Sequence, residues 1–224
     1  ETYRVALIGG DVSRTPERIV IDSIVVGEAA RGRSVQRSGA RPGDHIFVTG
    51  ALGGAAAGLR LLERGSRLET KPSRSSRSQA VEQLILRQLR PAPRVPWGAL
   101  LSEEHLATAM IDISDGLSSD LAHLCRESNV GARIDAARIP IDPPVIDLCG
   151  RRALDPLLLA LHGGEDFELL FTIRPRDLKR LPRGLGGVPV TYLGDVTNDA
   201  GHISLAEGSR VSTIEPAGFT HFNR

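Results

Sequence analysis

The chain has 224 residues, of which 41% are hydrophobic and 25% are charged, the composition of an ordinary globular protein. Its net charge of +1 excludes a strongly basic nucleic-acid binder, so we expect no nucleic-acid partner. No apolar run approaches the roughly 18 residues of a membrane span, so no membrane partner is expected either.

The residues that most often carry metal or covalent chemistry are sparse. Cys125 and Cys149 are the only cysteines and have no metal-ligand or redox spacing, which is typical of reduced thiols in a cytoplasmic protein. The six histidines do not cluster, which disfavours a zinc site. Lys71 and Lys179 are the only lysines, so lysine-based covalent catalysis is disfavoured as well.

The first expected elements are strands. Residues 3–8 form an apolar run that predicts a strand ending at Gly9-Gly10-Asp11, and residues 19–21 and 24–26 predict a second β-rich stretch. Small and charged residues at 27–32 indicate a domain boundary. Because the chain begins at Glu1, almost inside a strand, we expect it to be a piece of a longer protein.

The next segment predicts a strand, a helix, a loop and a second helix. Residues 45–49 predict a strand, and the glycine-rich residues 50–54 connect it to a helix. Residues 65–79 are rich in serine and arginine and lack periodicity, so they predict a solvated loop, with a phosphate or RNA contact as the alternative. Residues 84–89 predict a helix that ends near Pro91.

The third strong strand is expected at residues 108–113. A helix follows from Leu117, with Ser114 or Asp115 as its candidate cap. Further strands are expected at residues 132–135, 167–173, 188–193 and 203–205. Strands and helices mix without strict βαβ alternation, which favours an α+β fold.

Three acidic clusters lie beside these strands. They are Gly9-Gly10-Asp11, Asp112-Ile113-Ser114-Asp115-Gly116 and Gly163-Gly164-Glu165-Asp166. Carboxylates at the end of a strand, just before a helix N-terminus, suit a Mg²⁺–polyphosphate site, because hard cations prefer oxygen ligands and helix N-termini favour phosphates. Each cluster alone is also typical of a turn, since Asp and Gly are good turn residues. Three clusters beside strands favour the metal site.

Two other features are less specific. Residues 50–54 resemble a phosphate loop, but the chain lacks a G-x-x-x-x-G-K-[ST] motif, which favours a tight strand–helix turn. Arg37 lies in a basic loop ahead of a strand, where it either clamps a phosphate or is simply solvated.

Seven stretches in order make the chain recognisable. It resembles the thiamine-monophosphate kinase family, part of the superfamily that includes aminoimidazole ribonucleotide synthetase and selenophosphate synthetase. The stretches cover essentially the whole chain: Leu7-Ile8-Gly9-Gly10-Asp11, Arg37-Ser38-Gly39-Ala40-Arg41-Pro42-Gly43-Asp44, Val48-Thr49-Gly50, Leu89-Arg90-Pro91-Ala92-Pro93-Arg94, Ile111-Asp112-Ile113-Ser114-Asp115-Gly116-Leu117, Gly163-Gly164-Glu165-Asp166-Phe167-Glu168-Leu169, and Gly218-Phe219-Thr220-His221-Phe222.

The resemblance implies an activity and a fold. The activity is phosphorylation of thiamine monophosphate by ATP with Mg²⁺, by direct transfer of the γ-phosphoryl group to give thiamine diphosphate. The fold would comprise remnant strands of an N-terminal α/β domain, which binds ATP, at residues 1–28, and a C-terminal mixed α/β sandwich domain at residues 29–224.

The resemblance also implies roles for individual residues, carried over by motif. The implied Mg²⁺ ligands are Asp11, Asp112 and Asp115. The implied ATP contacts are Gly10, Asp11, Arg37 and Ser114. The implied contacts to thiamine monophosphate are Glu165 and Phe219.

The chain departs from the family in one large respect. In the family roughly a hundred further residues precede the position of Glu1, supplying more of the metal site and a homodimer interface. We therefore expect the full-length parent to be a homodimer and the isolated chain to have little or no activity. Two alternatives stay open: another ATP-using synthetase of the superfamily, and a non-catalytic nucleotide-binding fragment.

Overall fold

The computed structural model describes residues 3, 5–68, 75–150 and 154–218. The chain divides into two compact units, Glu1–Ser34 and Val35–Arg224. Within the described residues, all helices and strands belong to the second unit. No described helix is long and apolar enough to cross a membrane.

The strands expected at residues 3–8, 19–21 and 24–26 are wrong. Residues 3 and 5–34, where described, contain no helix or strand. Their apolar side chains are exposed: Leu7 is 95% accessible and Ile21 is 83% accessible. A strand satisfies its backbone N–H and C=O groups only by pairing, and the described part of this unit offers no partner strand. Sequence pattern alone does not reveal whether a partner is present.

The second unit is built on one sheet. Its strand order is β2-β4-β1-β6-β3-β7-β8, with β5 paired to β6 outside this path. All the pairs are antiparallel except β3 with β7. The strands are β1 (His45–Thr49), β2 (Ala107–Asp112), β3 (Gly131–Asp135), β4 (Leu169–Ile173), β5 (Gly184–Leu185), β6 (Val188–Thr197), β7 (Ile203–Glu207) and β8 (Arg210–Thr213).

Helices connect the strands and cover the sheet. The α-helices are α1 (Gly54–Glu63), α2 (Ser76–Leu89), α3 (Val95–Glu103), α4 (Leu117–Ser128), α5 (Pro143–Cys149) and α6 (Pro156–His162). The 3₁₀-helices are η1 (Ala136–Arg138) and η2 (Pro175–Arg180).

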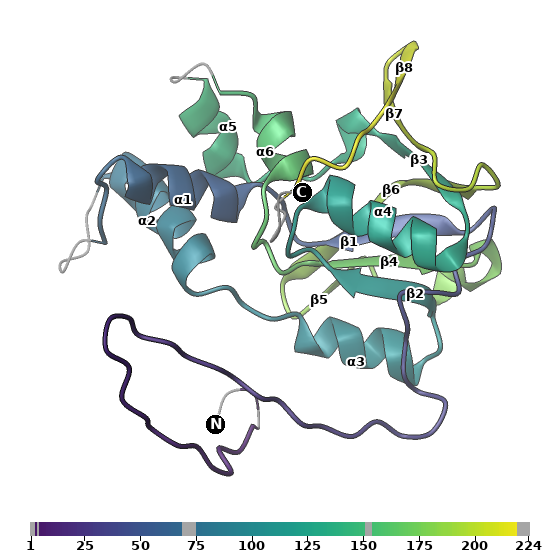
Figure 1. Cartoon of the computed structure of the whole chain (residues 1–224). Helices are drawn as coiled ribbons and strands as arrows, with labels where there is room; N and C mark the ends of the chain where they lie inside the picture. Colours follow the sequence, from purple (N-terminus) through teal and green to yellow (C-terminus); the bar gives the residue numbers. More distant parts are fainter. Residues whose placement is uncertain (1–2, 4, 69–74, 151–153, 219–224) are drawn as a thin grey trace. The chain divides into compact units, whose positions relative to one another are not determined.

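The sheet is covered on both faces, and the alternation of side chains in β1 shows why. Ile46 and Val48 are buried in the core beneath α4, whereas Phe47 points to the opposite face. There it packs with Trp97 and Leu101 of α3. Figure 1 shows α4 and α3 on opposite sides of the sheet. A third apolar cluster joins α1, α2 and α5. These layers confirm the mixed α/β architecture.

Several elements differ from the expectations. The helix α2 begins at Ser76, inside the expected loop at residues 65–79, because the Ser75 side chain accepts a hydrogen bond from Ser78 N–H and caps it. Residues 69–74 lie outside the described part of the chain. The helices α3, α5 and α6 were not expected, since each is short and has proline in its first turn. Proline is tolerated there because a first-turn N–H has no partner within the helix.

Candidate active site

The acidic segment lies where the sequence predicted, between a buried strand and a helix. Strand β2 ends at Asp112, which is paired in register with Leu169 of β4. Ile113 is fully buried, Asp112 is exposed and Asp115 is half-buried. Residues 112–116, the metal loop, comprise the last residue of β2 and the turn that leads directly into α4. The loop therefore presents two carboxylates at the end of a strand and the start of a helix.

Asp120, which the sequence analysis missed, holds the metal loop. Its Oδ2 accepts hydrogen bonds from the backbone N–H groups of Ser114, Asp115 and Gly116, at 3.0, 3.0 and 3.1 Å. The expected cap, Ser114 or Asp115, is wrong: the N-cap is Gly116, and no side chain bonds in the cap position. One buried carboxylate in the first turn of α4 orders the loop instead, assisted by the positive end of the helix.

Burial raises the pKa of Asp120 to about 6, although the backbone N–H groups act in the opposite direction. The nearby charges of Asp115 and Asp112 also raise this pKa. Asp120 is therefore protonated at a higher pH than an ordinary aspartate.

This raised pKa predicts a pH dependence of stability. The folded value of about 6 lies above the ordinary value of 3.8, so the folded state binds more protons between these pH values than the unfolded state does. Without divalent cations, the free energy of unfolding should fall as pH rises from about 4 to about 6. Urea unfolding of wild type and Asp120→Asn across this range measures the effect. We expect a shallower fall in the variant; an unchanged slope would contradict the assigned titration.

The second acidic cluster lies against the metal loop. The loop of residues 163–168, the acceptor loop, forms three backbone hydrogen bonds with it: Glu165 N–H to Ser114 O at 2.8 Å, Phe167 N–H to Ile113 O at 2.9 Å and Ile113 N–H to Glu168 O at 2.8 Å. A side chain at Gly164 would come within 2.4 Å of Ser114 O, so only glycine allows this approach.

The acceptor loop has an uncommon backbone conformation. Glu165 has φ 63° and Phe167 has φ 49°, values in the left-handed region that non-glycine residues seldom adopt. Such conformations cost of the order of 1–3 kcal/mol each and persist only where the surroundings impose them. Glu165 itself is exposed, and its carboxylate accepts a hydrogen bond from Gln88 of α2.

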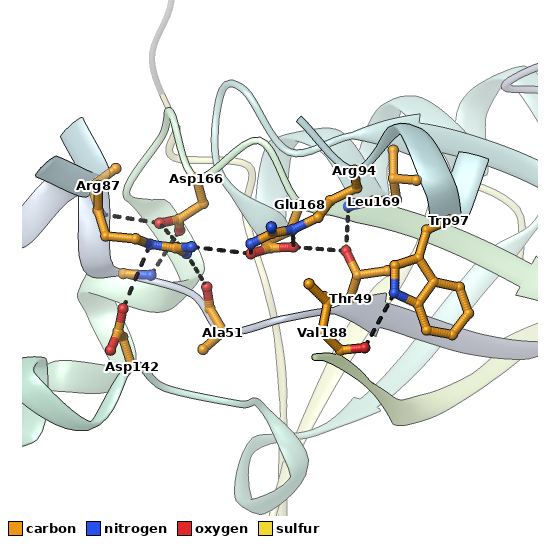
Figure 2. A network of polar contacts seen from close by, with 12 residues as sticks. Thr49, Ala51, Arg87, Arg94, Trp97, Asp142, Asp166, Glu168, Leu169 and Val188 are labelled. Carbon is orange, nitrogen blue, oxygen red and sulfur yellow. Dashed lines mark hydrogen bonds and ion pairs between the residues drawn. The ribbon is translucent and has the colours of Figure 1, made fainter. Parts of the chain in front are cut away.

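The other two carboxylates of the acceptor loop, those of Asp166 and Glu168, are buried and lie beside arginine side chains (Figure 2). Asp166 accepts hydrogen bonds from Gly53 N–H at 2.7 Å and Ala55 N–H at 3.1 Å, at the start of α1. Gly53 N–H of the glycine-rich turn at residues 50–54 and Ala55 N–H just after it therefore bind a carboxylate of the protein, which favours the tight turn over a phosphate loop. Burial raises the pKa of Asp166 to about 6, partly offset by these N–H groups and by Arg87.

Arg37 and Asp112 line the same open pocket, of about 590 Å³, together with Ser38, Met110 and Leu169. The segment that carries Arg37 runs along the edge of β2, where Met110 N–H donates to the carbonyl of Gln36 at 2.9 Å. The structure thus brings a candidate phosphate-binding arginine and a candidate metal ligand to one cavity.

Three sequence-predicted residues stand apart from this geometry. Gly10 and Asp11 lie exposed in the unit Glu1–Ser34, and their assignment to ATP and Mg²⁺ stays a prediction. Phe219 lies outside the described residues. The residue before it, Gly218, donates its N–H to Ser119 Oγ at 3.0 Å, and a side chain there would come within 2.0 Å of Asp115 O.

The donors present fit a hard cation. Asp112 and Asp115 offer carboxylate oxygens, the ligands that Mg²⁺ prefers, on a loop that is already ordered. Ligand atoms of Asp115, Asp120 and His123 also lie within 4.8 Å of one another. Asp120 already accepts three backbone hydrogen bonds, so Asp112 and Asp115 are the better placed ligands of the described residues.

Residues 41–205 match the family model described as AIR synthase related protein, C-terminal domain. The chain belongs to this family. The AIR synthase-related chain is 39% identical over 225 residues to thiamine-monophosphate kinase of Escherichia coli K12, covering 98% of this chain and 64% of that protein. It is 36% identical to thiamine-monophosphate kinase of Bacillus subtilis 168, and the match covers 98% of this chain and 65% of that protein. The chain thus spans about 64% of the length of these curated relatives.

Solved structures agree with this membership. The AIR synthase-related chain superposes on thiamine-monophosphate kinase from Stenotrophomonas maltophilia K279a with a TM-score of 0.69 at 37% identity, covering 79% of this chain and 54% of that one. It superposes on a structure described as AaThiL complexed with AMPPCP and TMP with a TM-score of 0.67 at 34% identity, covering 84% and 54%. The resemblance and the fold class inferred from sequence are therefore confirmed.

Proposed function

We propose that the protein containing this chain is a thiamine-monophosphate kinase, which transfers the γ-phosphoryl group of ATP directly to thiamine monophosphate and forms thiamine diphosphate. The observation that carries the proposal is the contact between the metal loop and the acceptor loop, which brings metal-binding carboxylates beside an exposed glutamate. Relatives of this name match nearly the whole chain, and one similar structure is described with both an ATP analogue and TMP.

The proposed roles are those that the family resemblance implies, and for Gly10, Asp11 and Phe219 they rest on the resemblance alone. Asp112 and Asp115 would hold Mg²⁺, and the resemblance adds Asp11 as a further ligand. Arg37 and Ser114 would contact ATP, together with Gly10 and Asp11. The proposed contacts to thiamine monophosphate are Glu165 and Phe219.

The chemistry is phosphoryl transfer by positioning and charge neutralisation. Both substrates are anionic, so their phosphates repel each other as they approach. Mg²⁺, when bound, would supply the positive charge that a P-loop lysine supplies in other enzymes. Arg37 would bind phosphate oxygens, and the ordered metal loop would keep its carboxylates in place without reorganisation during transfer. No covalent enzyme intermediate is needed.

The proposal also covers the cellular location and the oligomeric state of the enzyme. We propose a cytoplasmic enzyme that acts as a homodimer, with the dimer interface in residues that precede this chain. The oligomeric state can be measured by size-exclusion chromatography with light scattering on the protein encoded by the whole reading frame. A monomer would contradict the proposed homodimer.

The direct test is an assay of the protein encoded by the whole reading frame. With ATP, thiamine monophosphate and Mg²⁺, we expect thiamine diphosphate and ADP in equal amounts, separated by liquid chromatography. Chelation with EDTA should abolish the product, and excess Mg²⁺ should restore it. ADP formation without thiamine diphosphate would indicate another ATP-using synthetase. Nucleotide binding without any turnover would indicate a non-catalytic protein.

A further inference from the structure

Two arginines, to which the family resemblance gives no role, bind the buried carboxylates of the acceptor loop. Arg94, just before α3, binds the carboxylate of Glu168 with two nitrogens: Nε to Oε2 at 2.6 Å and Nη2 to Oε1 at 2.5 Å. Arg87 of α2 adds a contact from Nη1 to Oε1 of Glu168 at 3.2 Å. The same guanidinium lies 3.6 Å from Asp166 and 3.5 Å from Asp142 (Figure 2).

The surroundings of Glu168 are built to accept this pair. Glu168 is completely buried, and Thr49 donates its hydroxyl to Oε2 at 2.8 Å while accepting from Leu169 N–H at 2.9 Å. A side chain at Gly50 would come within 2.2 Å of the carboxylate, so glycine leaves the necessary space. A two-pronged guanidinium–carboxylate contact in such a setting fixes orientation as well as charge.

These arginine–carboxylate contacts, the arginine anchor, hold a segment whose backbone is strained. Asp166 and Glu168 alternate with Glu165 and Phe167, the two residues with positive φ. Because both buried carboxylates are tied to arginines, the backbone between them has little freedom to relax. Gln88, next to Arg87 on α2, holds the Glu165 carboxylate itself.

The metal loop has a separate anchor. Asp120 accepts hydrogen bonds from the N–H groups of Ser114, Asp115 and Gly116, whereas Arg87 and Arg94 bind carboxylates of the acceptor loop. The two loops touch through backbone hydrogen bonds but are held by different side chains.

We propose that Arg87 and Arg94 are positioning residues for the phosphate-acceptor substrate: acting through Asp166 and Glu168, they impose the conformation of the acceptor loop that presents Glu165. The inference rests on the proposed function, in which Glu165 contacts thiamine monophosphate. It adds that different residues position the two substrates: the arginines order the loop that contacts the acceptor substrate, and Asp120 orders the loop that holds the metal.

The test is a comparison of Michaelis constants in Arg94→Lys. Lysine keeps the positive charge and the volume but cannot form the two-pronged contact. We expect the KM for thiamine monophosphate to rise about tenfold, the size of effect seen when a supporting residue is changed, and the KM for ATP to stay within about threefold. Arg87→Lys should behave in the same way, which guards against one variant that fails to fold.

The matched control is Arg180→Lys. Arg180 of η2 forms ion pairs with Glu104 at 3.1 Å and Asp177 at 3.4 Å on the surface, and neither partner belongs to either loop. Both of its Michaelis constants should stay at the wild-type values. Equal rises for both substrates in Arg94→Lys and Arg87→Lys, or no change in either constant, would overturn the inference.

A second readout keeps the inference separate from the proposed function. If the wild-type protein does not phosphorylate thiamine monophosphate, the proposed function fails, yet the anchor is still testable by amide hydrogen exchange. Arg94→Lys should speed exchange at residues 163–168 at least about tenfold while residues 114–116 keep their protection. Exchange that is unchanged at residues 163–168, or that rises equally at both loops, would refute the separate anchor.

Discussion

Asp112→Asn is expected to lower the turnover of thiamine monophosphate at least about a hundredfold, because changes outside the ligand shell already cost 10–100-fold in metal sites. Asp112 is exposed at the end of β2 and shares its pocket with Arg37. Asparagine keeps the shape of the side chain but removes its negative charge, so it weakens the hold on Mg²⁺. Part of the lost activity should return at high Mg²⁺, which a Mg²⁺ titration of kcat measures.

The matched control is Asp135→Asn. Asp135 also ends a strand, β3, but its carboxylate accepts from Ala137 N–H and pairs with Arg138 on the surface. Its turnover should stay within about twofold of wild type, since exposed pairs of this kind contribute little. Equal activity of Asp112→Asn and wild type would contradict the metal-ligand role.

Glu168→Ala is expected to lower the free energy of unfolding by about 3–5 kcal/mol, because it removes one partner from a buried ion pair. Arg94 would lose its two-pronged contact, and its guanidinium, only 13% exposed, would be left without a counter-charge from Glu168. Arg87 would keep Asp142 and Asp166, so the loss should fall mainly on Arg94. Urea unfolding of the variant and of wild type measures the difference.

Glu104→Ala is the control for this effect. Glu104 pairs with Arg180, and both side chains are about half exposed. Exposed pairs typically contribute less than about 1 kcal/mol, so its stability should stay close to wild type. Equal losses of unfolding free energy in the two variants would show that the buried ion pairs of Glu168 stabilise the fold no more than an exposed pair does.

The spacing of apolar residues correctly predicted several of the helices and strands. The strands at residues 45–49 and 108–113 alternate or bury their apolar side chains, and the helices α1 and α4 repeat theirs at helical spacing, so all four appear in the structure. Residues 3–8 and 19–26 have the same β pattern, but those of them that the structure describes form no strand. A strand needs a partner as well as a pattern.

The candidate site divides in the same way. The sequence located the carboxylates of the metal loop, because Asp and Ser between buried isoleucines and a glycine are visible in one short segment. It did not identify Asp120 as the residue that holds this loop, since a buried serine-rich helix turn offers no sign of which side chain turns back. The family resemblance singled out Glu165, but the residue pattern did not show that its neighbours Asp166 and Glu168 are buried and bound within the protein.

The sequence by itself determined the family, the fold class, and the chemistry available at the end of β2, because these depend on residue types at short and ordered spacing. Only the tertiary structure decided what each carboxylate does. Glu168 meets Arg94 across 74 residues of chain, and Asp166 meets Gly53 across 113. Contacts of that range exist only once the sheet has formed, and they determine which acidic groups are buried in the fold and which, such as Asp112 and Glu165, stay exposed.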